Sequence, residues 1–234
     1  MQVKDRMTPD PVTVTEDTSF EDALHLMKGK GIRRLLVTSH DGRLIGIAVE
    51  KDFSSASPSG ATSLSVFEMH YLLVKLKIKE VMTKKVVTVG DDCPLEEAAR
   101  IMVDHKIGCL PIVKDGRLVG IITETDIFKT FVEILGGRAK GLRLTLDMSE
   151  GKGVLAVIAN EIVKDGGNIV SLATFFCKDA DERIITLRVT DADQASLLEG
   201  LEAKSIHVLN ARDMSNGGYL PRIIDAKTTP YVRV

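Results

Sequence analysis

The sequence predicts a mixed α+β chain in which one strand-and-helix unit occurs twice and is followed by a separate α+β domain. Three observations lead to this prediction. Residues 3–53 and 78–127 align with each other across one gap, and Met7-Thr8 returns as Met82-Thr83. Short apolar strands alternate with amphipathic helices in both copies, while residues 142–209 follow a different rhythm. A repeat of this length is one supersecondary unit used twice, so we expect the copies to pack about a pseudo-twofold axis.

The first copy, residues 1–54, is predicted to run strand, helix, strand, strand, helix. An extended segment at 11–14 precedes a helix that Thr18 or Ser19 can cap, and Gly31 ends it. The apolar residues of this helix fall at helical spacing and are Phe20, Ala23, Leu24 and Met27. Two strands and the hairpin turn between them are expected at 35–38, 44–49 and His40-Asp41-Gly42.

The second copy, residues 78–135, is predicted to have the same order of elements. Before it, residues 55–77 form a linker that is rich in Ser, Ala, Gly and Pro and then becomes helical at about 64–76. Pro94 suits the first turn of a helix. The later strands, their turn and a final apolar helix are expected at 110–113, 118–123, Asp115-Gly116 and 127–135.

The C-terminal part is predicted to be a small α+β domain at 142–214, reached through a short linker at 136–141. Its order βαββαβ indicates a ferredoxin-like sandwich with both helices on one face of the sheet. The strands and helices are expected, in order, at 142–147, 154–163, 169–176, 183–189, 192–203 and 207–209. Residues 215–234 are left as a tail.

Composition excludes several function classes. The net charge of −2 and the aromatic content of 4% without Trp favour neither nucleic acid nor a membrane surface as a partner. The chain has no apolar run long enough for a membrane span and no apolar signal core at its start, so we expect a cytoplasmic protein. The three cysteines form no CxxC pair or Cys/His cluster, so no metal is expected.

No catalytic constellation is visible in the sequence. We find no paired carboxylates with a partner base, no Ser/His or Cys/His arrangement and no Walker loop. The sequence therefore predicts a protein that is not an enzyme and that needs no catalytic cofactor.

The run from Gly120 to Asp126 reads Gly-Ile-Ile-Thr-Glu-Thr-Asp, and the same position of the first copy ends at Asp52. This run, the Met-Thr pairs and Gly108–Pro111 resemble the motifs of a tandem CBS-domain pair. Residues Glu150–Leu155 and Gly167–Ile169 resemble an ACT domain, although Lys152 stands where that family usually has Pro. The order CBS–CBS–ACT is similar to that of the accessory proteins of bacterial acetoin-utilisation operons.

The CBS resemblance implies an adenine-nucleotide site, because in that family the final carboxylate of the run binds both ribose hydroxyls. A Thr hydroxyl faces the phosphate, and basic residues of the opposite copy close over it. Carried over to this sequence, the site residues are Asp126, Thr123, Thr125, Arg33, Arg34, Ile107, Val86 and Thr88, of which the last three would line the adenine. The Asp52 cleft is expected to be degenerate, because Val49 replaces Thr and Gly108-Cys109 carry no charge.

Two structural alternatives stay open at this point. Asp126 can cap the helix that follows it, and both arginines can form surface ion pairs. The ACT resemblance implies a small amino acid at a dimer interface, contacted by Glu150, Gly153 and Asn168, or else dimerisation without a ligand.

Taken together, these observations predict a homodimeric sensor protein. Its expected small-molecule effector is AMP, ADP, ATP or an adenosyl derivative. The resemblance to acetoin-operon proteins adds a target enzyme of carbon metabolism as a further partner. The alternative is a structural oligomerisation or docking subunit with empty clefts.

Overall fold

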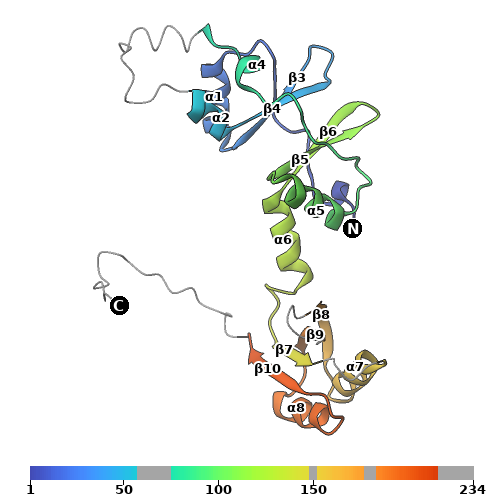
Figure 1. Ribbon diagram of the computed structural model, residues 1–234. Helices are drawn as coiled ribbons and strands as arrows, with labels where there is room; N and C mark the ends of the chain where they lie inside the picture. Colours follow the sequence, from blue (N-terminus) through green and yellow to red (C-terminus); the bar gives the residue numbers. More distant parts are fainter. Residues whose placement is uncertain (57–74, 148–151, 177–182, 216–234) are drawn as a thin grey trace, which may run out of the picture. The chain divides into compact units, whose positions relative to one another are not determined.

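The computed structural model describes residues 1–56, 75–147, 152–176 and 183–215 (Figure 1). The chain forms two compact units, Met1–Phe128 and Lys129–Val234. Most of the helix predicted at about 64–76, and nearly all of the tail at 215–234, lie outside the described residues.

The first copy forms a three-stranded sheet with two helices, in the predicted order. Its elements are β2 (Thr13–Thr15), α1 (Phe20–Lys30), β3 (Arg34–Thr38), β4 (Leu44–Val49) and α2 (Glu50–Ala56). The sheet order is β2-β3-β4, with β2 parallel to β3 and β3 antiparallel to β4. Ser19 caps α1 by accepting the Asp22 N–H at 3.1 Å, and Gly31 ends the helix at φ 62°. The capping and helix-stop predictions are confirmed.

The second copy has the same order except for its first strand, and comprises α5 (Leu95–His105), β5 (Cys109–Lys114), β6 (Arg117–Thr123) and α6 (Glu124–Ile134). The expected first strand is reduced to a single parallel bridge between Val89 and Ile112. Pro94 stands at the N-cap of α5. Helix α6 begins at Glu124, three residues before the predicted start. The reason is that the Asp126 carboxylate accepts the Thr123 N–H at 3.0 Å, which satisfies a backbone donor at the first turn.

The opening segment of each copy packs on the other copy. From the start of the chain come η1 (Val3–Asp5) and β1 (Thr8–Pro9), and β1 pairs antiparallel with β6 of the second copy. Val3 is fully buried in the core of that copy. In return, α4 (Ile78–Val81) is packed into the first core, and Thr83 forms a bridge with Ile47. The two copies are therefore joined by an exchange that the internal alignment does not reveal.

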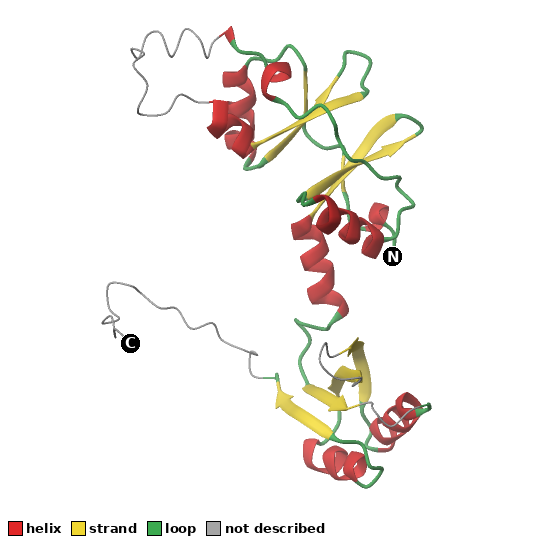
Figure 2. Ribbon diagram, in the orientation of Figure 1, coloured by secondary structure: helices red, strands yellow, loops and turns green. Residues whose placement is uncertain are grey.

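The second unit has the predicted ferredoxin-like topology. Its elements are β7 (Leu142–Asp147), α7 (Val154–Lys164), β8 (Asn168–Phe176), β9 (Arg183–Thr190), α8 (Gln194–Glu202) and β10 (Val208–Asp213). The antiparallel sheet has the order β10-β7-β9-β8. Both helices pack on one face of it, where alternate residues of β7 and β9 form the core (Figure 2). Arg143 and Arg188, which pair across β7 and β9, lie on the other face.

Across the described residues, no helix combines the length and the apolar character that crossing a membrane requires.

Candidate functional site

A cavity of about 410 Å³ lies between the two copies of the first unit. The first copy contributes Arg33 and Arg34 at the start of β3, the end of β4, and the first residues of α2. The second copy contributes the segment from Thr83 to Val87 and the turn between α5 and β5. The exchange of opening segments builds this cavity, because the bridge between Thr83 and Ile47 carries the following residues onto β4.

The lining combines an apolar wall with several cations. The apolar side chains are Ile47, Val49, Val86, Val87, Ile107, Cys109 and Pro111. The cationic side chains are Arg33, Arg34, Lys51, Lys85 and Lys106, while Glu50 is the one carboxylate in the lining. A cavity of this kind suits a ligand with a flat apolar ring and an attached anion.

Arg34 reaches from the first copy to the second. Its guanidinium Nη2 lies 3.2 Å from Glu124 Oε1, and the side chain is 18% exposed. Gly108 leaves room for this contact, since a Cβ there would collide with Arg34 and would approach Glu124 Oε1 to 3.1 Å. The partner carboxylate is 51% exposed, so the pair is worth little as a stabilising contact. Its effect is to hold a cation at the edge of the cavity.

The two motif carboxylates both take capping bonds. Asp52 Oδ2 accepts the Val49 N–H at 2.8 Å, and Asp126 Oδ2 accepts the Thr123 N–H at 3.0 Å. Asp126 Oδ2 also accepts the Thr123 hydroxyl at 2.7 Å. Asp126 therefore does cap the helix that follows Thr123, which was the structural alternative to ligand binding. The Thr123 hydroxyl donates its hydrogen bond to Asp126 of the same motif.

The structure groups the predicted nucleotide residues differently from the sequence analysis. Arg33, Arg34, Val86 and Ile107 line the cavity beside Val49 and Lys51, at the start of the helix that carries Asp52. Thr123, Thr125 and Asp126 are not part of its lining, and Thr88 lines a different cavity beside the hairpins.

The Val49 side was expected to be degenerate, because Val49 replaces Thr and because Gly108 and Cys109 carry no charge. Gly108 and Cys109 do line this cavity, but five cations line it as well. Three of these, Lys51, Lys85 and Lys106, were missed by the sequence analysis. Lys51 directly precedes Asp52, and Lys85 directly precedes the predicted adenine strand, so each stood next to a recognised motif.

Cys109 belongs to the apolar part of the wall. Its side chain is 6% exposed, and burial raises the pKa of its thiol, while the nearby Arg34 opposes that shift. The thiol therefore stays neutral at physiological pH and behaves as a small apolar group.

The predicted amino-acid residues of the second unit are not brought together within one chain. Gly153 has φ 92° and stands at the N-cap of α7, and Asn168 opens β8 after that helix. The eleven residues of α7 separate the two by about 16 Å at 1.5 Å per residue. A site that uses both therefore needs two chains. Glu150 lies outside the described residues.

Within the ranges that the structure describes, no group of three His, Cys, Asp or Glu side chains is placed to hold a metal ion.

Two copies of a βαββα unit around a cationic cavity, followed by a ferredoxin-like domain, define a two-module α+β protein. Comparison with known proteins places these modules in families. The CBS domain model matches residues 3–59 and 78–133, and a TTHA0829-like ACT domain model matches residues 140–212. The chain belongs to the CBS-domain proteins and carries a C-terminal ACT domain.

The similar proteins described next each match slightly more than half of this chain. A CBS domain-containing protein of Dictyostelium discoideum is 31% identical over 134 residues, which are 57% of this chain and 92% of that protein. A solved Vibrio cholerae structure, described as an acetoin utilization protein (AcuB), is 33% identical and covers 59% of this chain and 95% of its own, with a TM-score of 0.50.

A structure of CBSX2 solved in complex with AMP is 29% identical and covers 57% of this chain and 97% of its own, with a TM-score of 0.47. The chain spans only 24% of a matched homoserine O-acetyltransferase of Methanohalobium evestigatum.

Proposed function

We propose that this protein is a non-enzymatic regulatory protein that binds an adenine nucleotide in the cavity between its CBS copies. The observation that carries the proposal is the cavity itself, in which an apolar wall adjoins five cationic side chains. Its volume of about 410 Å³ falls in the range of small-molecule sites. AMP, ADP, ATP and adenosyl derivatives share the flat base and ribose that such a cavity can hold.

Each part of the nucleotide has a matching group. Val86, Val87 and Ile107 offer the adenine an apolar surface, and the guanidinium groups of Arg33 and Arg34 offer paired donors to a phosphate. The CBS resemblance assigns the ribose hydroxyls to the carboxylate that ends the motif. On this side of the pair that residue is Asp52, which is not itself among the lining residues but directly follows Lys51, which is. We therefore assign the nucleotide to the cleft beside Asp52 and not, as the sequence predicted, to the cleft beside Asp126.

The experiment is calorimetric titration of the full chain with AMP, ADP and ATP. We expect Asp52→Ala to weaken binding by at least about tenfold, since a carboxylate that accepts two hydroxyl donors is lost. The matched variant Asp126→Ala should bind almost as the parent does. Loss of binding in Asp126→Ala alone would place the nucleotide in the other cleft. No binding by the parent would favour the alternative, an oligomerisation or docking subunit without a ligand.

A regulatory role requires that the nucleotide favour one of two arrangements of the protein. The similarity to the Vibrio cholerae protein supports a place in acetoin or related carbon metabolism, with an enzyme of that metabolism as the target. In the ACT domain, we propose that two chains form a homodimer, and that Gly153 of one chain and Asn168 of the other contact a small amino acid.

A further inference from the structure

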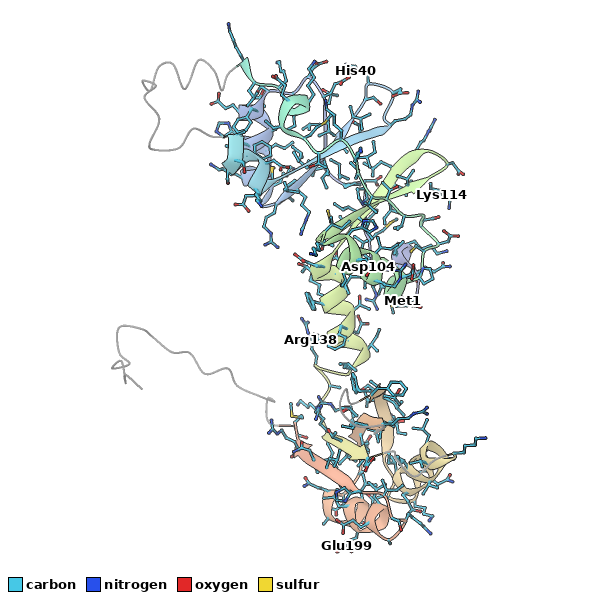
Figure 3. All side chains as sticks on the ribbon, in the orientation of Figure 1. Met1, His40, Asp104, Lys114, Arg138 and Glu199 are labelled. Atoms are coloured by element: carbon cyan, nitrogen blue, oxygen red, sulfur yellow. The ribbon has the colours of Figure 1, made fainter. Side chains whose placement is uncertain are left out.

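A second cavity, of about 350 Å³, lies in the ACT-containing unit and is strongly cationic. The linker before β7 contributes Arg138 and Lys140, β9 contributes Arg188, and Met214 and Ser215 follow β10. Figure 3 shows Arg138 on the linker that precedes this domain. No carboxylate is among the residues that line the cavity, although three cations are.

Arg188 is the unusual member of this group. It lies on the sheet face opposite the helices, is only 4% exposed, and has no hydrogen-bond partner for Nε or Nη1 among the described residues. Its neighbour across the strands is another cation, Arg143, whose Nη1 donates to Thr145 at 3.0 Å. Burial, and secondarily the charge of Arg143, lower the pKa of Arg188. No negative side chain compensates this guanidinium within the described part of the chain.

The backbone of the linker lies close to Arg188. Gly136 is buried, and a Cβ at that position would lie 2.8 Å from Ser171 Oγ and 3.4 Å from Arg188 Cβ. Only a residue without a side chain lets the backbone approach β8 and β9 this closely. The linker therefore packs against the base of the Arg188 side chain, and Arg188 also lines the cavity.

A buried donor that carries charge and has no acceptor destabilises a fold. An anion in the cavity would remove that cost, because a guanidinium edge presents two parallel N–H donors to two oxygens. We propose that this cavity binds a small oxyanion, a carboxylate or a phosphate, with Arg188 as the principal donor and Arg138 and Lys140 as flanking cations. The site shares no residue with the nucleotide cavity and does not depend on it.

The test uses the full chain with two probes, inorganic phosphate and malonate, titrated against chloride at matched ionic strength. We expect a saturable rise of the melting temperature of the ACT domain and a matching calorimetric isotherm with at least one probe. Arg188→Gln should abolish both signals, and Arg188→Lys should weaken binding by about tenfold, because an ammonium group lacks the paired donors. The probe that saturates at lower concentration distinguishes a carboxylate ligand from a phosphate ligand.

Two controls separate a built site from general charge effects. Lys204→Gln removes one exposed positive charge that does not line the cavity, and Asp52→Ala alters only the nucleotide cleft, so both should bind the probes as the parent does. If Arg188→Gln fails to fold, the exposed Arg138→Gln and Lys140→Gln variants serve in its place and should each weaken binding several-fold. Absence of saturable binding by the parent, or an equal loss in Lys204→Gln, would overturn the proposal.

Discussion

At the scale of single residues, two methionine–glycine contacts join the exchanged segments to the sheets. Met7 lies over Gly120 of β6, and Met82 lies over Gly46 of β4. A Cβ at Gly120 would come within 3.1 Å of Met7 Cγ, and a Cβ at Gly46 would come within 3.0 Å of Met82 Cγ. The same pairing in both copies explains why the Met-Thr and Gly-Ile pairs return together in the sequence. Each glycine provides the space in which the other copy's methionine packs.

Gly120→Ala should therefore destabilise the CBS pair. Overpacking a fitted contact costs about 1–3 kcal/mol, and Met7 must move or leave the second core. Gly29→Ala is the control, because Gly29 lies within α1 with no atom within 4 Å of an added Cβ. It should stabilise the same unit by about 0.5–1 kcal/mol, the usual helix preference of Ala over Gly. Urea unfolding followed by circular dichroism measures both, and equal effects would contradict the contact.

Cys109 should make the stability of the CBS pair fall at alkaline pH. Burial raises the pKa of its thiol in the folded state, so the folded state keeps a proton that the unfolded chain releases. This contribution is present below the ordinary thiol pKa of about 8.5 and is lost as pH rises through the higher folded value.

The measurement is urea unfolding between about pH 7 and 10, in a Cys93→Ala background because burial also raises the pKa of Cys93. Adding Cys109→Ala should flatten the fall in unfolding free energy above about pH 8.5. An unchanged slope would show that the thiol does not titrate differently in the folded state.

At the scale of elements, the exchange of opening segments makes each copy incomplete without the other. The Val3 N–H donates to the Cys93 carbonyl at 2.9 Å, and its side chain is packed into the second core. Leu95 at the start of α5 likewise donates its N–H to the Met1 carbonyl at 3.1 Å. The start of the chain is therefore part of the second copy's structure, although the alignment assigns it to the first.

Val3→Ala should loosen the second copy rather than the first. Removing two buried methyl groups from a core of this density costs about 1–3 kcal/mol. In hydrogen exchange, we expect faster exchange in β5 and β6 and little change in β3 and β4. Val103→Ala is the matched control, because Val103 is 75% exposed on α5 of the same copy. Faster exchange confined to β3 and β4 would mean that Val3 belongs to the first core.

The sequence predicted the local elements well because their causes are local. Helix α1 follows from apolar spacing, a Ser19 cap and a Gly31 stop, all visible within a dozen residues. The start of α6 was placed too late because Asp126 caps from inside the helix, where a motif carboxylate was expected to point at a ligand.

The candidate site was predicted in part, for a similar reason. The types of residue were recognised, since Arg33, Arg34, Val86 and Ile107 do line one cavity. In the structure they line it beside Val49 and Lys51 and not beside Thr123 and Asp126, because the bridge from Thr83 to Ile47 is a long-range pairing that no spacing encodes. Arg188 went unnoticed because one arginine in an alternating strand looks like a solvated residue until its burial is known.

At the scale of the whole molecule, β8 is the surface on which we expect the proposed homodimer to form. It stands at one edge of the sheet and is nine residues long. Its exposed apolar side chains include Val170 at 42%, Leu172 at 40% and Phe176 at 74%. Strand β10 at the other edge is six residues long, and Leu209 is its one exposed large apolar side chain. A long edge strand with apolar side chains is a template for pairing with another strand. The β8 edge is therefore the more favourable surface for a second copy of this chain.

Leu172→Lys should convert the expected dimer into a monomer. A charge placed on an apolar edge strand opposes strand pairing, and a charged side chain buried in the interface would have no partner there. We expect the dimer dissociation constant to rise by at least about tenfold in sedimentation equilibrium. Leu209→Lys is the matched control, since it adds the same charge at a similarly exposed leucine, 46% against 40%, on the opposite edge. It should leave the mass of the dimer unchanged.

If Leu209→Lys dissociates the dimer and Leu172→Lys does not, the interface uses β10. A parent that sediments as a monomer at every concentration would exclude the dimer, and with it any amino-acid site that needs Gly153 and Asn168 from two chains.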